Sequence, residues 1–144
     1  MPPTDTVDPE TLPARVHASA VAVGTCGVLI RGASGVGKST MALRMIAQGA
    51  VLVADDYCDV VEQAVSPVLS TPSTIAGMIE ARGTGLLRLP VSPPVSLGLV
   101  IELVANPNQS SERLPPLRFA NFGRHQIPLH LMSEGSRAAA IAMV

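Results

Sequence analysis

Lysine is nearly missing from this chain. Ten of the 144 residues are basic, and Lys38 is the single lysine beside nine arginines. The formal net charge at pH 7 is −1 and the sequence has no basic run, so it lacks the electrostatic footprint of a protein that binds DNA, RNA or an anionic membrane. Aromatic residues are also scarce, with one tyrosine, two phenylalanines and no tryptophan. Single-stranded nucleic acids bind by stacking on such side chains, so this scarcity disfavours a nucleic-acid partner as well.

Cysteines and long apolar runs are the other shortages. Cys26 and Cys58 have neither metal-ligand spacing nor a disulfide pattern, and each adjoins a strand-like run, which predicts small buried side chains in a reducing compartment. Arg31 and Arg44 interrupt the most apolar region before it reaches the roughly 18 residues of a membrane-spanning helix. The N-terminus is acidic and rich in proline, unlike a signal peptide. These shortages predict a cytoplasmic protein.

The remaining composition fits one domain. Hydrophobic residues make up 47% of the sequence, which is enough for a single core in a chain of this length. Residues 1–13 hold four prolines and three acidic residues, which predicts a disordered leader. We expect residues 14–144 to form the folded domain.

A glycine loop around Lys38 is the most informative stretch. It fits the pattern G-x-x-x-x-G-K-[ST] of the P-loop, in which backbone amides cradle phosphate while the lysine and the hydroxyl complete the site. A compact point charge suits phosphate, which explains a lysine here in a chain that otherwise uses arginine. The predicted nucleotide-binding residues are Gly32, Ala33, Ser34, Gly35, Val36, Gly37, Lys38, Ser39 and Thr40.

The flanking sequence has the order that such a loop requires. Apolar residues 28–30 predict a strand before it, and residues 40–48 predict a helix after it, with apolar side chains at i, i+4 spacing. The start of that helix adds unpaired N–H groups and the positive end of the helix dipole. We expect Lys38 to lie in a solvent-accessible crevice at this junction. The alternative is a glycine-rich turn with an incidental lysine.

A hairpin is predicted immediately before the loop. Residues 16–23 favour a strand, and Gly24 with Thr25 favours a tight turn into a second strand over residues 26–31. This hairpin would bring His17 within reach of the phosphate site. A lone histidine is more often a surface or hydrogen-bonded residue, so both interpretations of His17 stay open on position alone.

Two acidic residues follow the next predicted strand. Residues 50–54 form an apolar run that ends at Asp55 and Asp56, which resembles a Walker B element. Ligands of open α/β sheets bind at the carboxyl ends of strands, so this pair should face the same crevice as the P-loop. Neighbouring side chains of an extended chain point in different directions, so one carboxylate can serve Mg²⁺ and the other can accept a proton. The alternative is a turn-forming Asp-Asp pair.

The rest of the chain carries weaker signals. Residues 57–65 suggest a strand, and Thr71 as a cap with Pro72 at a first helical position predicts a short helix through Ile79. A second glycine element follows, in which Glu80 and Arg82 stand beside glycines. Further expectations are a strand over 95–104 with Glu102 at an edge or on the solvated face, a polar loop over 106–116, a last strand over 127–132, and a helix or strand over 136–144.

Taken together, four motifs resemble the catalytic domain of HPr kinase/phosphorylase. They are His17-Ala18, the glycine loop, Asp55-Asp56 and the E-x-R-G-x-G element that begins at Glu80. The resemblance implies an α/β fold, a P-loop nucleotide-binding domain with a mixed β-sheet related to phosphoenolpyruvate carboxykinase. It also implies a serine kinase that phosphorylates the phosphocarrier protein HPr with ATP or pyrophosphate, and that removes this phosphate by phosphorolysis.

The resemblance assigns roles residue by residue. Lys38 would bind phosphate, and Ser39 and Glu80 would be the protein ligands of Mg²⁺. Asp56 would accept the proton in the forward direction and donate it in reverse, supported by His17 and Asp55. Either Arg82 or the backbone of residues 83–85 would position the acceptor or its phosphate. The family is a hexamer, which implies a homo-oligomer here.

Two departures from the family pattern concern the ends of the chain. The family usually carries an N-terminal domain, so a chain with only a short leader looks like the form seen in alphaproteobacteria. The family also has a late Pro-Gly-Arg-Asn loop with a catalytic arginine, and its best counterpart is Glu134-Gly135-Ser136-Arg137, where the arginine is displaced by one position. Arg137 is therefore the last candidate catalytic residue.

Two other classes of function fit the P-loop. A P-loop kinase of small molecules would need a lid or a substrate pocket, and the chain is short and poor in arginine between its motifs. A nucleotide-binding regulator without turnover would keep the P-loop but would not need Asp56 as a base.

Overall fold

The computed structural model describes residues 11–33, 35–72, 77–81, 85–104 and 118–132. These residues form one helix and eleven strands. The elements in the first half are β1 (Ala14–Val16), β2 (Ser19–Val23), β3 (Cys26–Gly32), α1 (Lys38–Ala47), β4 (Val51–Ala54) and β5 (Cys58–Val61). The second half contains β6 (Val68–Ser70), β7 (Met78–Ala81), β8 (Gly85–Arg88), β9 (Val95–Leu103), β10 (Arg118–Phe122) and β11 (His125–Met132).

Nine strands form one mixed sheet. Its main path runs β1-β5-β6-β9-β3-β2-β4, and β11 joins β9 and carries β10. The pairs β3–β9 and β9–β11 are parallel, whereas β2 is antiparallel to both β3 and β4. The expected α/β fold with a mixed sheet is confirmed.

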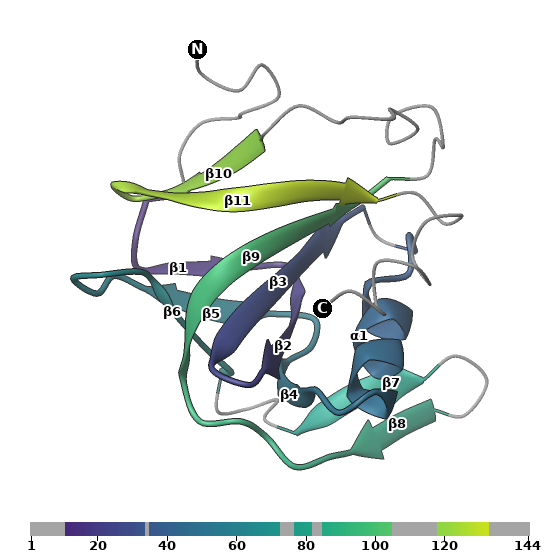
Figure 1. Ribbon diagram of the computed structural model, residues 1–144. Helices are drawn as coiled ribbons and strands as arrows, with labels where there is room; N and C mark the ends of the chain where they lie inside the picture. The colour runs from purple at the N-terminus through teal and green to yellow at the C-terminus, as the bar shows by residue number, and fades with distance from the viewer. Residues whose placement is uncertain (1–10, 34, 73–76, 82–84, 105–117, 133–144) are drawn as a thin grey trace.

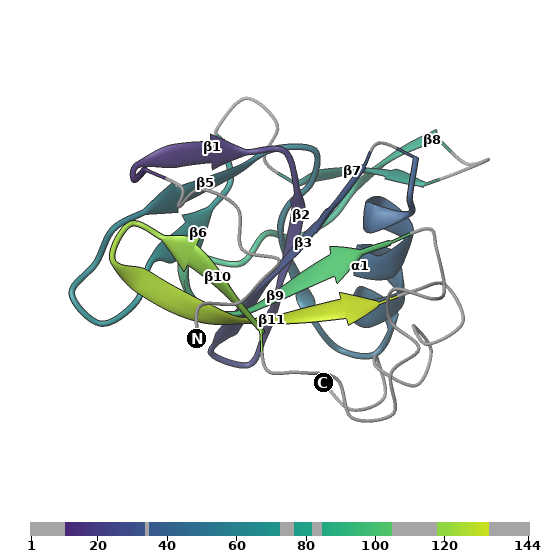
Figure 2. The same ribbon diagram turned by 90° about the horizontal axis from the view of Figure 1, so that it is seen from above.

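Two apolar cores lie on opposite faces of the central strands. Helix α1 and the β7–β8 hairpin cover one face, and β1, β5 and β6 turn over the other (Figures 1 and 2). The core under α1 includes Ile30, Met41, Met45, Ile79 and Ile101. The opposite core includes Leu29, Val60, Leu69, Val100 and Phe122. Alternate residues of β3 and β9 therefore serve different cores, as the two-residue period of a strand requires.

The carboxyl ends of four strands meet at one edge of this sheet. β3, β9 and β11 run in parallel, and β4 runs with them because both β3 and β4 are antiparallel to β2. An ion pair joins β3 to β9 near this edge, where Arg31 Nε donates to Glu102 Oε1 at 3.0 Å. Glu102 was expected at an edge or on the solvated face. It lies on an inner strand and not at an edge, and its side chain, 30% exposed, is paired with Arg31. The glycine loop and the Asp pair both follow strands that end here, as predicted.

The hairpin before the glycine loop is confirmed, but its first strand is shorter than predicted. Residues 16–23 divide into the end of β1 and the whole of β2, with His17 in the break. β1 pairs with β5 whereas β2 pairs with β3 and β4, so the chain changes partners at this point. Pairing with distant strands leaves no local sequence signal, which is why the break was not predicted.

The predicted helix does not extend through Ile79, and residues 73–76 of that prediction lie outside the described part of the chain. Met78 and Ile79 belong to β7, which pairs with β8, and Ile79 is fully buried in the core under α1. Gly77 has φ +79° and accepts a hydrogen bond from Leu89 N at 2.7 Å. A Cβ at Gly77 would lie 2.9 Å from Leu89 O, so a close backbone approach fixes the hairpin here. At Met78 and Ile79 the strand contacts therefore override the helix that was predicted from Thr71 and Pro72.

The other expectations for the second half are partly met. The strands over 95–104 and 127–132 are confirmed as β9 and β11, the strand over 57–65 shortens to β5, and β10 was not predicted. The predicted loop 106–116, the tail 136–144 and most of the leader lie outside the described residues. No helix among the described residues is long and apolar enough to cross a bilayer. The cytoplasmic location stays a prediction.

The two cysteines differ in exposure. Cys58 is buried as predicted, but Cys26 is exposed at the start of β3, and both are free thiols. Burial raises the pKa of Cys58 to about 12, whereas an exposed thiol ordinarily has a pKa near 8.5. A cysteine reacts as its thiolate. Burial of Cys58 therefore lowers its reactivity, because the thiolate is scarce, and also keeps reagents away from the sulfur.

We therefore expect an alkylating reagent to modify one cysteine of the native protein at pH 8. Mass spectrometry of peptides should find the label on Cys26, with Cys58 modified at least about a hundredfold more slowly, because its thiolate is scarce at this pH. In guanidinium both should react alike. The raised pKa of Cys58 also contributes stability below pH 9 that is lost as pH rises from 9 to about 12. Equal labelling of the two thiols in the native protein would contradict this assignment.

Candidate active site

The glycine loop joins β3 to α1 with little room for side chains. A Cβ at Gly32 would lie 2.7 Å from Val36 Cγ1 and 3.0 Å from Leu103 O, so only glycine fits there. Gly37, at φ +106°, is the N-cap residue of α1, a conformation that side chains rarely adopt. Val36 N donates to Ala33 O at 3.2 Å, which closes the loop on itself. The loop therefore has a defined shape at the sheet edge.

The start of α1 supplies positive potential to this loop. Gly37 makes no side-chain capping hydrogen bond, and the first turn of α1 has no acidic residue. The amides of the first turn lack helical partners, and they carry the positive end of the helix dipole. Anions bind readily at such a place.

Lys38 folds back over the loop rather than into open solvent. Its Nζ donates to Gly32 O at 2.9 Å and to Ala33 O at 3.2 Å, and the residue is only 8% exposed. The expectation that Lys38 lies in a solvent-accessible crevice is therefore wrong. An ammonium group has three donors, so these two contacts leave one for an anion held by the loop.

Asp55 lies next to Ser39 and is bound by two hydroxyls. Ser39 Oγ donates to Asp55 Oδ1 at 2.7 Å, and Ser19 Oγ donates to the same oxygen at 2.6 Å. Asp55 is 6% exposed and Ser19 is 1% exposed. Helix α1, strand β2 and the end of β4 thus meet at one carboxylate oxygen.

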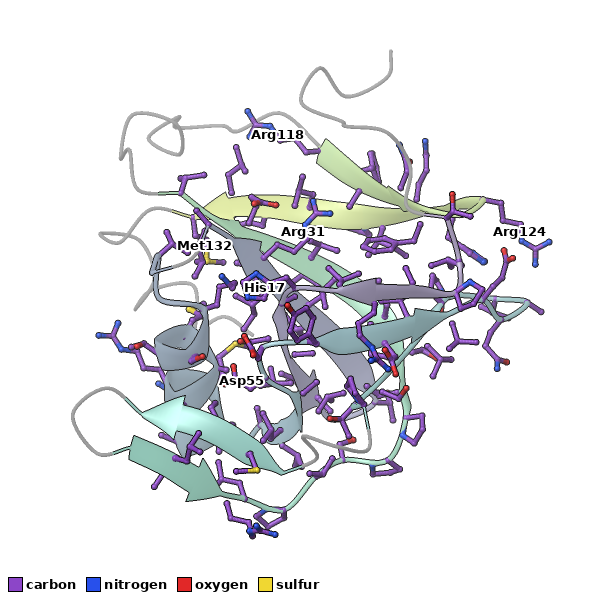
Figure 3. All side chains as sticks on the ribbon, turned by 180° about the vertical axis from the view of Figure 1, so that it is seen from behind. His17, Arg31, Asp55, Arg118, Arg124 and Met132 are labelled. Atoms are coloured by element: carbon purple, nitrogen blue, oxygen red, sulfur yellow. The ribbon has the colours of Figure 1, made fainter. Side chains whose placement is uncertain are left out.

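Asp56 has a different environment from its neighbour. Its side chain is 68% exposed and its Oδ1 lies 3.3 Å from His17 Nε2. The His17 and Tyr57 rings are 5.3 Å apart between centroids, tilted by 46°. Figure 3 shows His17 and Asp55 between α1 and the strands β1 and β5. One carboxylate of the pair is therefore buried beside the glycine loop, and the other faces solvent beside a histidine.

A strained turn separates the two carboxylates. Asp56 has φ +72°, and it is the one non-glycine residue with positive φ in the described ranges. Tyr57 N donates to Asp55 O at 2.8 Å and Ala18 N donates to Asp56 O at 3.1 Å, so both sides of the turn are held. A three-residue turn of this kind is rare and strained. The two side chains do point in different directions, but because of this turn and not because of the extended chain that was predicted.

Oxygen donors dominate the site, which suits a hard cation. A hydroxyl and a carboxylate, as in Ser39 and Asp55, are the donor types that Mg²⁺ prefers. Within the described ranges, no group of three or more His, Cys, Asp or Glu side chains could hold a metal by itself. A cation here would therefore share its coordination with ligand oxygens and water.

The remaining predicted residues are not brought together by the described part of the chain. The backbone of Glu80 lies in β7, which packs on α1, but its side chain is not described. Ser34, Arg82 and Arg137 lie outside the described residues. Their roles stay predictions.

Comparison with known proteins identifies the family. The sequence profile of the HPr Serine kinase C-terminal domain matches residues 11–115, which include the glycine loop and the Asp pair. This chain belongs to that family.

Relatives and a solved structure agree with this membership. The chain is 44% identical over 82 residues to the HPr kinase/phosphorylase of Clostridium tetani, an alignment that covers 57% of this chain and 26% of that protein. The corresponding protein of Clostridium acetobutylicum is 42% identical over 86 residues, covering 60% and 27%. The chain therefore spans about a quarter of the length of these curated relatives.

The likeness extends to the backbone. The structure of the Hpr(Ser) kinase/phosphatase from Coxiella burnetii superposes with a TM-score of 0.78 at 26% identity, and the alignment covers 90% of this chain and 87% of that one.

Sequence reasoning missed two residues of this HPr kinase-type site. Ser19 is an ordinary small residue at the start of an apolar strand, and Tyr57 follows the Asp pair. Ser19 is the one polar residue of β2, and a polar residue in a buried strand needs a hydrogen-bond partner. That was the available signal, although it does not say which partner.

Proposed function

We propose that this chain is a serine protein kinase of the HPr kinase/phosphorylase type. In this proposal it transfers phosphate from ATP or pyrophosphate to a serine of the phosphocarrier protein HPr, with the reverse phosphorolysis at the same site. The observation that carries the proposal is the separation of two carboxylates beside the glycine loop. Asp55 accepts from Ser39, whereas Asp56 is exposed and lies 3.3 Å from His17. Phosphoryl transfer needs one acidic group that helps to hold the charge-neutralising cation and another that takes the proton.

The loop and Lys38 serve the phosphate groups in this proposal. The loop amides and the start of α1 hold the phosphates, and Lys38 uses its remaining donor on them. Ser39, with Asp55 behind it, holds Mg²⁺, which when bound neutralises charge on the transferred group. In this proposal residues 32–40 act as a P-loop. We also propose that the fold is related to phosphoenolpyruvate carboxykinase, because the resemblance of the four sequence motifs to HPr kinase/phosphorylase implies that relation.

Asp56 accepts the proton as the serine attacks. The serine oxygen forms a bond to the terminal phosphorus, the bond from that phosphorus to the leaving oxygen breaks, and the hydroxyl proton passes to an Asp56 oxygen. His17 lies where it can orient Asp56. In reverse, the same group returns the proton to the serine oxygen while orthophosphate attacks.

The exposure of Asp56 favours a protein acceptor over a small molecule. A side chain that is 68% exposed can contact a folded partner, whereas kinases of small molecules close a lid over the reacting groups. This is the reason to prefer HPr over the small-molecule alternative. We further propose Glu80 as a second Mg²⁺ ligand, Arg82 and Arg137 as groups that position the acceptor or phosphate, and a homo-oligomer of the hexameric type.

A transfer assay separates the three candidate functions. The chain is incubated with Mg²⁺ and ATP labelled in the γ-phosphate, together with HPr, with HPr whose acceptor serine is replaced by alanine, or with a pool of small hydroxyl compounds. We expect label on intact HPr alone. Label on small compounds would support the small-molecule kinase. Nucleotide binding without labelling of any acceptor would support the regulator. Adding orthophosphate to phosphorylated HPr then tests phosphorolysis.

A further inference from the structure

Ser19 contacts the site, but the proposed function gives it no role. Its hydroxyl is 2.6 Å from Asp55 Oδ1, the oxygen that also receives the hydrogen bond of Ser39 at 2.7 Å. Ser19 is 1% exposed, so its hydroxyl has no access to bulk water and cannot touch an acceptor protein. The hydroxyl of Ser19 therefore reaches the site through its hydrogen bond to Asp55.

A β-bulge delivers Ser19 to this carboxylate. β2 pairs with β4 in one register at Val21↔Leu52 and in a shifted register at Ala20↔Ala54. Continuing the shifted register places Ser19 opposite Asp55 and Ala18 opposite Asp56, in agreement with the hydrogen bond from Ala18 N to Asp56 O. Without the shift, Ser19 would face Ala54. Bulges of this kind re-aim side chains next to active sites.

The hydroxyls of Ser19 and Ser39 both donate hydrogen bonds to one oxygen of Asp55, Oδ1. A carboxylate oxygen has about two lone-pair sites, and Ser19 and Ser39 direct a hydrogen to Oδ1 together. When Ser39 points its hydrogen at Asp55, its own lone pairs face away from the carboxylate, which is the orientation a cation ligand needs. A second donor from a rigid strand restricts rotation of the Asp55 side chain, so it also restricts Ser39.

We propose that Ser19 is a positioning residue for the cation site of this chain. It fixes Asp55, and through Asp55 it orients the Ser39 hydroxyl for Mg²⁺. This inference rests on one part of the proposed function, namely that a cation binds at Ser39 together with a nucleotide. Partners in this outer position typically change metal affinity by about 10- to 100-fold when they are removed.

Cation binding without turnover tests this proposal. Mn²⁺ replaces Mg²⁺, and free Mn²⁺ is measured by electron paramagnetic resonance in the presence of ADP and the full chain. We expect Ser19→Ala to raise the half-saturating Mn²⁺ concentration about tenfold. Ser19→Thr keeps the hydroxyl on a strand residue and should restore it to within about threefold of the native chain, on the same scale. Binding of fluorescent ADP in EDTA should stay unchanged in both variants.

A matched control separates positioning from general destabilisation. Val60→Ala opens space in the opposite core, where Val60 is fully buried, and should lower the midpoint of urea unfolding without moving the Mn²⁺ curve. The proposal is overturned if Ser19→Ala binds Mn²⁺ like the native chain, if Ser19→Thr is as impaired as Ser19→Ala, or if Val60→Ala gives the same shift. If Ser19→Ala does not fold, Ser19→Thr is compared with Ser19→Cys. A thiol is a weak hydrogen-bond donor, so Ser19→Cys should bind Mn²⁺ more weakly than Ser19→Thr.

The same measurements distinguish this inference from the proposed function. A native chain that binds Mn²⁺ with ADP but phosphorylates no HPr would refute the kinase, while the Ser19 variants would still decide the positioning role. A native chain that binds no Mn²⁺ with nucleotide would overturn the positioning role directly.

Discussion

Lys38→Ala is expected to reduce phosphoryl transfer to HPr by at least about a hundred- to a thousandfold. Among the described residues, Lys38 is a cation held on the glycine loop, where its Nζ already contacts Gly32 O and Ala33 O. Negative charge on the transferred group must be neutralised at the sheet edge, and the neutral loop amides cannot supply a full positive charge. Initial rates with labelled ATP give the measurement.

Arg44→Ala is the matched control for Lys38→Ala. Arg44 carries the same charge and lies in the last turn of the same helix, where it is exposed. Losing it should leave transfer within about twofold, since exposed charges at this distance are screened by salt. Both variants should keep a native circular-dichroism spectrum. If Lys38→Ala retained more than a tenth of native activity, the loop would not be the phosphate site.

Local signals correctly predicted the parts of the fold that have short-range causes. The turn at Gly24 and Thr25 predicted the β2–β3 hairpin, and the glycine loop with the helical spacing after it predicted α1. These features depend on residues that are close in sequence. The order of strand, loop and helix therefore followed from the sequence.

Long-range contacts decided the parts that were missed. Ile79 joins a strand because it packs under α1 and because Gly77 approaches Leu89, and neither contact is visible from the helix-start signal at Thr71. The break between β1 and β2 likewise depends on two different partner strands.

The site shows the same division between local and long-range causes. The strand ends correctly predicted that Asp55 lies beside the glycine loop, because this required only that β3 and β4 run the same way. The Asp56 side chain lies beside His17 instead. The strained turn at Asp56 and the bulge that aims Ser19 at Asp55 were not predictable, because each depends on the pairing of β2 with β4. Residue types alone therefore predicted the glycine loop and the Asp pair, but neither the contact of Ser19 with Asp55 nor the separate environments of the two carboxylates.

Asp56→Gly is expected to stabilise the fold while reducing transfer by about a hundred- to ten-thousandfold. Asp56 has φ +72°, which costs a non-glycine residue about 1–3 kcal/mol. Glycine removes that cost but adds about 0.5–1 kcal/mol of chain entropy, so the net gain should be about 0.5–2 kcal/mol. The lost contact with His17 subtracts little, because both side chains are exposed.

Asp56→Asn separates strain from chemistry. Asparagine tolerates positive φ and keeps the shape of aspartate, but its amide cannot accept the serine proton. We therefore expect near-native stability in urea unfolding, native binding of Mg²⁺-nucleotide, and the same loss of transfer as in Asp56→Gly. Gain of stability in Asp56→Gly with loss of activity in both variants would mean that the fold tolerates this strained position because it holds the carboxylate that transfer requires.

Two outcomes would reassign the carboxylates. Loss of Mg²⁺-nucleotide binding in Asp56→Asn would make Asp56 a cation group and leave Asp55 as the base, although Asp55 Oδ1 is already bound by two hydroxyls. Native transfer in Asp56→Asn would mean that no carboxylate at this position takes the proton. In that case His17, whose Nε2 lies 3.3 Å from Asp56 Oδ1 and whose side chain is 44% exposed, would be the acceptor to test next. His17→Gln in the Asp56→Asn background would then abolish the residual activity.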